Sequence, residues 1–254
     1  MIVTLLSDFG TVDGYVAELK GALLKGAPGA TLVDISHDLA PGDVVAAAYV
    51  LGRTWQAFPS GTVHLAVVDP GVGTPRRALA AEVDGHRFVA PDNGLLSRVL
   101  HGRQARVVAL NAPADASPTF HGRDVFAPAA ARLACGETMD ALGREVSDPV
   151  SLPPPRLERH GGDLVGEVVH VDRFGTLVTN LPGVRVAATA TVRIGAYDLA
   201  LHRTFADVAS GDPVAFVGSG GTIEIAVRDA RADAALGATR GVEVRAAVRP
   251  GGAA

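Results

Sequence analysis

The first half of the chain alternates strand-like and helix-like segments, and this order constrains the fold more than any other feature. Strand-like segments are expected at residues 2–8, 30–36, 62–69 and 105–110, and helix-like segments at 14–28, 43–58, 93–101 and 124–136. Residues 77–83 and 86–91 predict a short antiparallel pair around a turn at Asp84-Gly85. Alternation of this kind predicts a mostly parallel sheet with helices on both faces.

The sequence changes character between residues 147 and 162. This segment has three consecutive prolines, a glycine pair and no apolar period, which is typical of a linker. Short β-like runs with turn residues between them then follow, at 164–172, 176–181, 190–195, 197–201, 213–218, 222–227 and 241–248. They predict a small all-β barrel or sandwich. We therefore expect an α/β protein with an N-terminal α/β domain at 1–147, a linker at 148–162 and a smaller C-terminal β domain at 163–254.

Composition excludes several classes of protein. The chain has 254 residues, of which 48% are apolar and 20% charged, so it has the material for ordinary folded cores. A net charge of −4 without a cluster of Lys and Arg provides no surface for nucleic acid. The single cysteine, Cys135, excludes an intramolecular disulfide, and no apolar run approaches the roughly 18 residues of a membrane span. The first residues lack the pattern of a signal peptide, so a cytoplasmic protein is the simplest interpretation.

Polar side chains follow several of the predicted strands. Asp8 comes after the first strand and Asp69 after the third, while His121 lies shortly before the last helix of the first half. Ligands of parallel α/β sheets bind outside the carboxyl ends of the strands, so we expect these side chains at one rim. Asp69 is separated from Arg76 by a glycine-rich loop, and a charged pair across such a loop has few purely structural uses. The sequence therefore predicts a polar site at this edge of the sheet.

Other interpretations of the polar residues remain open. Asp124 is predicted to cap the helix that follows it, and Asp38 and Asp43 are predicted to mark a helix entry. Five histidines have no partner that the sequence indicates and are predicted to be structural or solvated: His37, His64, His86, His101 and His160. A Mg or Mn site is the second interpretation of the rim, with Arg76 competing against the cation; its ligands would be Asp8, Asp69, Asp92 and His121.

Six motifs appear in an order that resembles one enzyme family. They are SDFG, VDPGVGTPRR, APDNGLL, TFHGRDVFAPAAA, VDRFGTLVTN and VGSGGTIEIAV. Together they resemble the S-adenosylmethionine (SAM) hydroxide adenosyltransferases, which are SAM hydrolases that form adenosine and relatives of the fluorinating and chlorinating enzymes. The similarity runs from Met1 to about Gly241, and it includes the position of the linker.

The resemblance implies an N-terminal α/β domain, a C-terminal β-barrel and a homotrimer whose active sites lie between neighbouring subunits. It implies SAM as the substrate without a further cofactor or metal, and adenosine as a product. A catalytic triad that positions and activates water would be Asp69, Arg76 and His121. Residues implied to bind the substrate are Asp8 at the ribose hydroxyls, Phe120 beside the sugar, Phe174 and Phe205 flanking adenine, Asp172 at the methionine ammonium and Ser219 at its carboxylate.

The resemblance also leaves alternatives and departures. Halogenating relatives carry aromatic residues at the positions of Asp69 and His121 and lack the DPGVGT signature, which favours water over halide as the nucleophile. Thr176 replaces an amide that usually helps to hold the nucleoside, and Gly220 takes the position of an arginine in some halogenating relatives. We therefore predict hydrolysis of SAM to adenosine and methionine by in-line attack at C5′. The alternatives are a halogenase-type cleavage of SAM and a non-catalytic trimer that binds a nucleoside.

Overall fold

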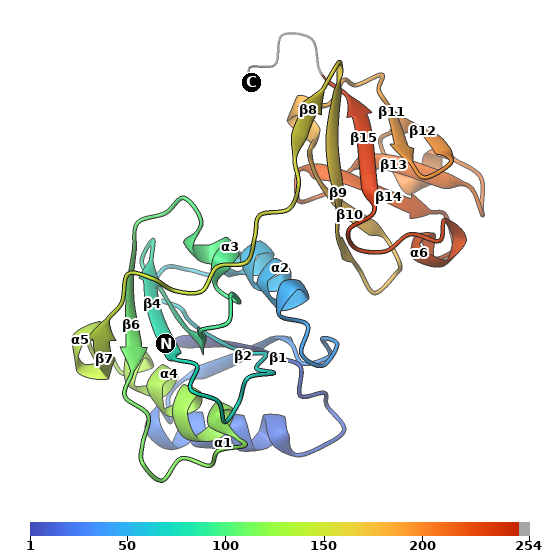
Figure 1. The fold of residues 1–254 in the computed structure, drawn as a ribbon. Helices are drawn as coiled ribbons and strands as arrows, with labels where there is room; N and C mark the ends of the chain where they lie inside the picture. The colour runs from blue at the N-terminus through green and yellow to red at the C-terminus, as the bar shows by residue number, and fades with distance from the viewer. Residues whose placement is uncertain (249–254) are drawn as a thin grey trace. The chain divides into compact units, whose positions relative to one another are not determined.

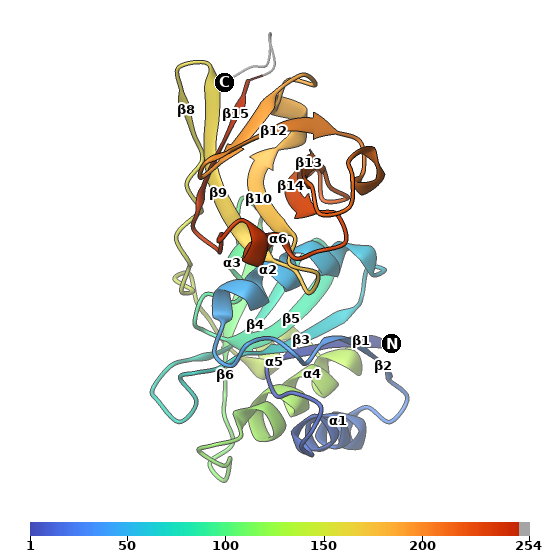
Figure 2. The same ribbon diagram turned by 90° about the vertical axis from the view of Figure 1, so that its right-hand side faces the viewer.

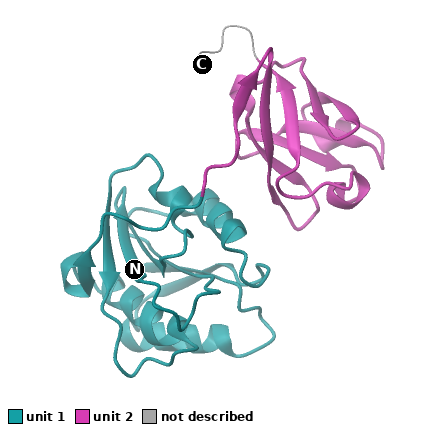
Figure 3. Cartoon of the chain, in the orientation of Figure 1, with its two compact units in different colours: residues 1–152 teal, residues 153–254 magenta. Residues whose placement is uncertain are grey.

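The computed structural model describes residues 1–248 and divides the chain into two compact units, residues 1–152 and 153–254 (Figure 3). The division falls in the proline-rich segment that the sequence marks as a linker at 148–162. Part of that segment is ordered as strand β8 (Glu158–His160), which pairs with strand β9 (Asp163–Val171). The sequence did not indicate this strand because its three residues are charged and carry no apolar alternation.

The first unit is built on a seven-stranded sheet in the order β2-β1-β3-β5-β4-β6-β7 (Figure 1). Strands β2, β1, β3 and β5 are parallel, and β4, β6 and β7 extend the sheet as antiparallel neighbours. The strands are β1 (Ile2–Ser7), β2 (Thr31–Ser36), β3 (Val63–Val67), β4 (Ala78–Val83), β5 (His86–Pro91), β6 (Ala105–Leu110) and β7 (Gly143–Glu145). The helices are α1 (Tyr15–Gly26), α2 (Val44–Thr54), η1 (Trp55–Ala57), α3 (Ser97–Leu100), the π-helical turn η2 (Gly122–Phe126), α4 (Ala127–Ala134) and α5 (Met139–Leu142). The predicted α/β sheet is confirmed.

Local sequence explains the turns of this sheet. The β4–β5 hairpin turns at Asp84 and Gly85, whose φ angles of 49° and 76° are the positive values that a tight two-residue hairpin needs. Asp43 caps α2 by accepting a hydrogen bond from the Ala46 N–H at 2.9 Å, as the sequence predicted.

Each face of the sheet carries its own apolar core. Val3 and Leu5 of β1 pack with α1 and α4, whereas Leu6 of the same strand packs with α2. Successive side chains of a strand point to opposite faces, so one apolar run supplies both layers. Figure 1 shows α1 beside α4, and α2 lies against α3 on the other layer. The prediction of helices on both faces is confirmed.

A chain of buried polar side chains runs through the layer next to α2. The Thr4 hydroxyl lies 2.8 Å from Nδ1 of His64, and Nε2 of His64 lies 3.1 Å from Nδ1 of His86. Trp55 packs edge-on against His86 at a centroid distance of 5.0 Å. Burial, and secondarily the neighbouring His86, lowers the pKa of His64 to about 3. His64 is therefore neutral in the folded protein over the physiological range, and this histidine is structural, as its sequence context predicted.

This neutral histidine makes the first unit sensitive to acid. The unfolded chain protonates His64 below its ordinary pKa of 6.5, whereas the folded protein resists protonation down to about pH 3. The contribution of His64 to the free energy of unfolding is therefore fully present above pH 6.5. It falls by about 1.4 kcal/mol for each pH unit between pH 6.5 and about 3. Urea unfolding followed by fluorescence of Trp55, the single tryptophan, should show this slope in the wild type. The slope should be shallower by that amount in His64→Gln, and equal slopes would contradict the assignment.

The second unit is a closed β-barrel with β8 attached outside the ring. Seven strands follow one another in the order β10-β14-β13-β12-β11-β15-β9, and pairing of β9 with β10 closes the ring (Figure 2). Its further elements are β10 (Leu177–Pro182), η3 (Gly183–Arg185), β11 (Thr191–Ile194), β12 (Tyr197–His202), η4 (Phe205–Asp207), β13 (Pro213–Val217), β14 (Thr222–Val227), α6 (Ala232–Ala235) and β15 (Glu243–Ala247). The barrel interior is a single apolar cluster, and the prediction of an all-β barrel is confirmed. Within residues 1–248, no helix has the length and apolar character to cross a membrane.

Candidate active site

Strands β1 and β3 bring two aspartates to the same edge of the first sheet. The strands are parallel neighbours and pair Ser7 with Val67, so the residues that follow both strands lie side by side. Asp8 follows β1 directly, and Asp69 follows β3 after one buried valine. Both aspartates line a cavity of about 320 Å³. This volume lies in the range of roughly 300–1,000 Å³ that is common for small-molecule sites.

Asp69 and Arg76 form a two-pronged ion pair across the glycine-rich loop. Nε of Arg76 donates to Oδ1 of Asp69 at 2.9 Å, and Nη2 donates to Oδ2. The side chains are 6% and 10% exposed, which shields the pair from solvent screening. Gly73 has a φ of 78°, and a Cβ there would lie 2.7 Å from the carbonyl oxygen of Pro118. Glycine is therefore required for the close approach of the segment that leads to His121.

His121 completes the cluster from 45 residues further along the chain. Its Nδ1 lies 2.8 Å from Nη2 of Arg76. Because a guanidinium can only donate, Nδ1 accepts this hydrogen bond, and the proton of the neutral ring is assigned to Nε2. Burial, followed by the charge of Arg76, holds the pKa of His121 below its usual range. The three predicted catalytic side chains thus form one contact network, with a neutral imidazole that has its N–H at Nε2.

The π-helical turn η2 explains how the network is held. His121 directly precedes η2, and Phe126 ends it. The guanidinium carbon of Arg76 lies 5.1 Å from the centre of the Phe126 ring, while the same guanidinium contacts His121. A π-helical turn pairs residues five apart, so it brings two such residues to the same side, and such turns are frequent at functional sites. The sequence did not reveal Phe126, because the apolar pattern of residues 124–136 looks like an ordinary helix.

The cavity also gathers the predicted ribose and sugar contacts. Phe120 lines it together with Asp8, Asp69 and His121. Oδ2 of Asp8 accepts a hydrogen bond from the Gly42 N–H at 2.7 Å. The first unit therefore brings together the three predicted catalytic residues and two of the six residues predicted to bind substrate.

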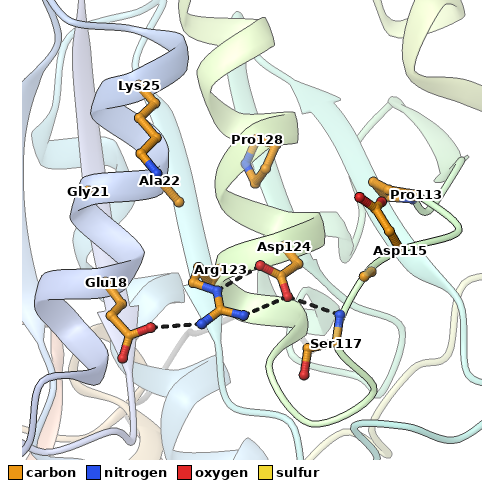
Figure 4. A pocket seen from close by; sticks show the side chains of 11 residues that line it. Glu18, Gly21, Ala22, Lys25, Pro113, Asp115, Ser117, Arg123, Asp124 and Pro128 are labelled. Carbon is orange, nitrogen blue, oxygen red and sulfur yellow. Dashed lines mark hydrogen bonds and ion pairs between the residues drawn. The ribbon is translucent and has the colours of Figure 1, made fainter.

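A second hollow of about 670 Å³ lies between α1 and the loop before η2 (Figure 4). Arg123 connects its walls by donating to Glu18 at 2.8 Å and to Oδ1 of Asp124 at 2.7 Å. Oδ2 of Asp124 accepts from the Ser117 N–H at 3.0 Å. The prediction that Asp124 caps a helix is wrong, because it lies inside η2 and α4 begins only at Ala127. The carboxylate instead fastens the loop that carries His121, and hydrogen bonds from Arg123 lower the pKa of Asp124.

The alternative metal site is not assembled by this geometry. Oδ2 of Asp92 accepts from Nε of Arg77 at 2.6 Å, and Oδ1 accepts from the Val150 N–H at 2.7 Å. Asp92 thus fastens the segment after β7 and does not line the cavity of Asp8 and Asp69. Among residues 1–248, no three or more His, Cys, Asp and Glu side chains are placed to hold a metal ion together.

The four predicted site residues of the barrel come from three connections of the second unit: Asp172 and Phe174 from the β9–β10 turn, Phe205 from η4 and Ser219 from the β13–β14 turn. Asp172 opens the β9–β10 turn and accepts from the N–H groups of Phe174 at 2.9 Å and Thr176 at 2.8 Å. Ser219 lies in the β13–β14 turn, at the opposite end of β10, because the turn residue Gly221 contacts Gly183. Within this unit the structure does not bring Asp172 and Ser219 together.

The two predicted adenine-flanking rings are both accessible. Phe174 is 77% exposed, and Phe205 is 46% exposed and packs on Phe216 with ring centres 4.6 Å apart. Large apolar side chains with this exposure are available to contact a ligand or another chain.

Comparison with known proteins agrees with this organisation. The family model of the SAM hydroxide adenosyltransferase N-terminal domain matches residues 3–143, and that of the C-terminal domain matches residues 166–245. A Thermus thermophilus protein named (R)-S-adenosyl-L-methionine hydrolase is 43% identical over 96% of this chain and 98% of its own. A protein from Actinoplanes sp. named fluorinase is 31% identical over 89% of this chain and 90% of its own. A solved structure from Thermotoga maritima, described as an uncharacterized conserved protein, superimposes with a TM-score of 0.89 at 33% identity, covering 97% of this chain and 100% of the other.

The fold and the site define a class of α/β proteins with an Asp–Arg–His network at the strand ends and a closed β-barrel after it. The two matched models together cover most of the chain, and the relatives match over nearly its whole length. The chain belongs to the SAM hydroxide adenosyltransferase family. The family resemblance inferred from the six sequence motifs is confirmed.

Proposed function

We propose that the protein hydrolyses S-adenosyl-L-methionine to adenosine and L-methionine by attack of water at C5′. The observation that carries this proposal is the network of Asp69, Arg76 and His121 beside a cavity of about 320 Å³. The hydrolase name of the 43% identical relative supports the same reaction and specifies the R configuration at sulfur. We accordingly propose the R epimer of SAM as the preferred substrate.

The chemistry requires a nucleophile more than it requires an acid. The oxygen of water forms a bond to C5′, the C5′–S bond breaks, and its electron pair stays on sulfur as the neutral thioether of methionine. No proton is needed at the leaving group. Free water has a pKa of about 15.7, so the site must stabilise hydroxide-like charge on the attacking oxygen. Arg76 supplies a permanent positive charge for this purpose.

The tautomer of His121 assigns the remaining roles. Because Nδ1 accepts from Arg76, Nε2 of neutral His121 carries the proton. Its N–H can donate a hydrogen bond to the oxygen of the attacking water and so orient it. The carboxylate of Asp69 is then the acceptor of the proton that water loses. Orientation adds to this, since well-aligned reactants save about 7–11 kcal/mol of barrier. A nucleoside whose ribose is held by Asp8, with Phe120 beside the sugar, meets that requirement.

We further propose a homotrimer as the working form. In this arrangement the barrel of one subunit supplies Asp172, Phe174, Phe205 and Ser219 to the Asp69 cavity of a neighbour. Support comes from the family resemblance and from the two exposed aromatic rings of the barrel. Sedimentation of the purified protein tests the stoichiometry directly.

The reaction is tested by incubating the purified protein with SAM and separating the nucleosides by mass. Adenosine should form, consumption of the R epimer should exceed that of the S epimer, and EDTA should leave the rate unchanged because no metal or other cofactor takes part. Parallel incubations with fluoride and chloride test the halogenase alternative. Fluoride is included because one relative, 31% identical, is named fluorinase. A 5′-halogenated nucleoside, a rate abolished by EDTA, or nucleoside binding without turnover would each contradict the proposal.

A further inference from the structure

Strand β1 carries two buried pairs of a hydroxyl and an imidazole. The Ser7 hydroxyl lies 2.7 Å from Nδ1 of His37, and the Thr4 hydroxyl lies 2.8 Å from Nδ1 of His64. All four residues are at most 4% exposed. Thr4 lies in the middle of the strand, whereas Ser7 is its last residue and immediately precedes Asp8. The two pairs are chemically alike but differ in their distance from the cavity.

The Ser7 pair is connected to the loop that presents Asp8. The Phe9 N–H donates to the Ser7 hydroxyl at 3.4 Å, and the Gly10 N–H donates to the backbone carbonyl of His37 at 2.8 Å. Gly42 holds Oδ2 of Asp8 at 2.7 Å from the other end of the same β2–α2 connection. The loop is therefore held on both sides by one segment, residues 37–42.

An acidic residue behind His37 fixes the direction of the hydrogen bond. Oδ1 of Asp34 lies 3.2 Å from Nε2 of His37, at ion-pair distance but outside hydrogen-bond alignment, and Oδ2 is 2.7 Å from Nζ of Lys20. A carboxylate attracts the ring proton to Nε2, so Nδ1 of the neutral ring accepts and the Ser7 hydroxyl donates. The hydroxyl oxygen then remains available to accept from Phe9, which ties the His37 ring to the backbone beside Asp8.

The carboxylate of Asp8 can still accept hydrogen bonds from a ligand. Gly42 occupies Oδ2, and within residues 1–248 Oδ1 has no hydrogen-bond partner while its residue lines the cavity. A carboxylate in this state accepts hydrogen bonds from hydroxyl groups, and a vicinal diol presents two of them.

We propose that Ser7 and His37 are positioning residues that orient Asp8 and thereby determine selectivity for a ribose diol over 2′-deoxyribose. This inference rests on the proposed function, in which Asp8 binds the ribose of SAM and adenosine. Neither residue touches the substrate; both act through the Asp8 loop. A displacement of about 1 Å in a positioning group is enough to cost a large factor in productive binding.

The test compares Ser7→Ala with Thr4→Val, since each removes one buried hydroxyl that pairs with an imidazole on the same strand. Calorimetry with adenosine and 2′-deoxyadenosine gives the selectivity, steady-state kinetics with SAM gives KM and kcat, and thermal unfolding gives the stability of each variant. Ser7→Ala should raise the Kd for adenosine and the KM for SAM about tenfold. The Kd for 2′-deoxyadenosine should change less than about twofold, because this ligand lacks the diol that the oriented Asp8 recognises. The kcat should also change less than about twofold, because neither residue touches the substrate. Thr4→Val should lower stability alone.

A second variant guards against misfolding of the buried substitution. Asp34 is 43% exposed, so Asp34→Asn should fold. It should reduce the preference for adenosine over 2′-deoxyadenosine, as Ser7→Ala does, but by a smaller factor. Equal losses for adenosine and 2′-deoxyadenosine in Ser7→Ala, or the same selectivity change in Thr4→Val, would overturn the inference while leaving the hydrolase proposal intact. A wild-type protein that neither binds adenosine nor consumes SAM would overturn the proposed function itself.

Discussion

Asp69→Asn is expected to lower kcat for SAM hydrolysis by about 10²–10⁴-fold and to change KM by less than about threefold. Asparagine keeps the size of the side chain and one acceptor for Arg76, but it cannot take a proton from water. The loss should therefore appear in the chemical step and not in substrate binding. Steady-state kinetics with purified SAM measures both constants.

Asp92→Asn is the matched control for this prediction. Asp92 is also a buried aspartate paired with an arginine, with Nε of Arg77 at 2.6 Å, and its side chain is 3% exposed against 6% for Asp69. The control should lower thermal stability to a similar extent and leave kcat within about twofold, because Asp92 does not line the cavity. If Asp69→Asn retained wild-type kcat, or if both variants lost activity equally, proton acceptance by Asp69 would be excluded.

Arg76→Lys is expected to lower kcat by about 10²–10³-fold although it preserves the positive charge. Lysine cannot reproduce the planar fork that contacts both oxygens of Asp69 and Nδ1 of His121. Arg76→Gln removes the charge as well, and it should lose at least as much activity. The two variants separate geometry from charge.

The same variants have different pH profiles. Burial and the charge of Arg76 both lower the pKa of His121, and protonated His121 cannot accept the Arg76 N–H. In the wild type, kcat/KM should therefore be constant near pH 7 and fall only below pH 6.5, the ordinary histidine value. Arg76→Gln should move this acid limb to higher pH because one of the two causes is gone, whereas Arg76→Lys should leave it in place. Identical acid limbs in all three proteins would contradict the assigned contact.

Local contacts of the site could be predicted from the sequence. Asp69 and Arg76 are only seven residues apart in one glycine-rich loop, so their pairing needs little of the fold. The rule that ligands bind at the carboxyl ends of parallel strands was enough to place Asp8 beside Asp69. The Asp84-Gly85 hairpin and the Asp43 cap likewise depend on neighbouring residues alone.

Contacts between distant segments could not be predicted in this way. His37, which follows β2, and His64 of β3 find their hydroxyl partners on β1, 30 and 60 residues away in sequence, and nothing in their own segments indicates which hydroxyl it will be. Asp124 has the local signature of a helix cap, yet Arg123 and the Ser117 N–H compete successfully for its carboxylate. The π-helical turn η2 also escapes prediction, because residues 125–131 are almost all apolar and their pattern does not reveal the extra residue of the turn.

The most direct test of the central claim is hydrolysis of SAM in water labelled with ¹⁸O. Attack of solvent water at C5′, beside Asp69, Arg76 and His121, predicts one labelled oxygen in the 5′-hydroxyl of adenosine and none in methionine. Mass spectrometry of the two products, separated after a single incubation without added metal, measures this. Adenosine that carries no label would show that water is not the nucleophile at C5′, and water activation by the Asp69–Arg76–His121 network would be contradicted.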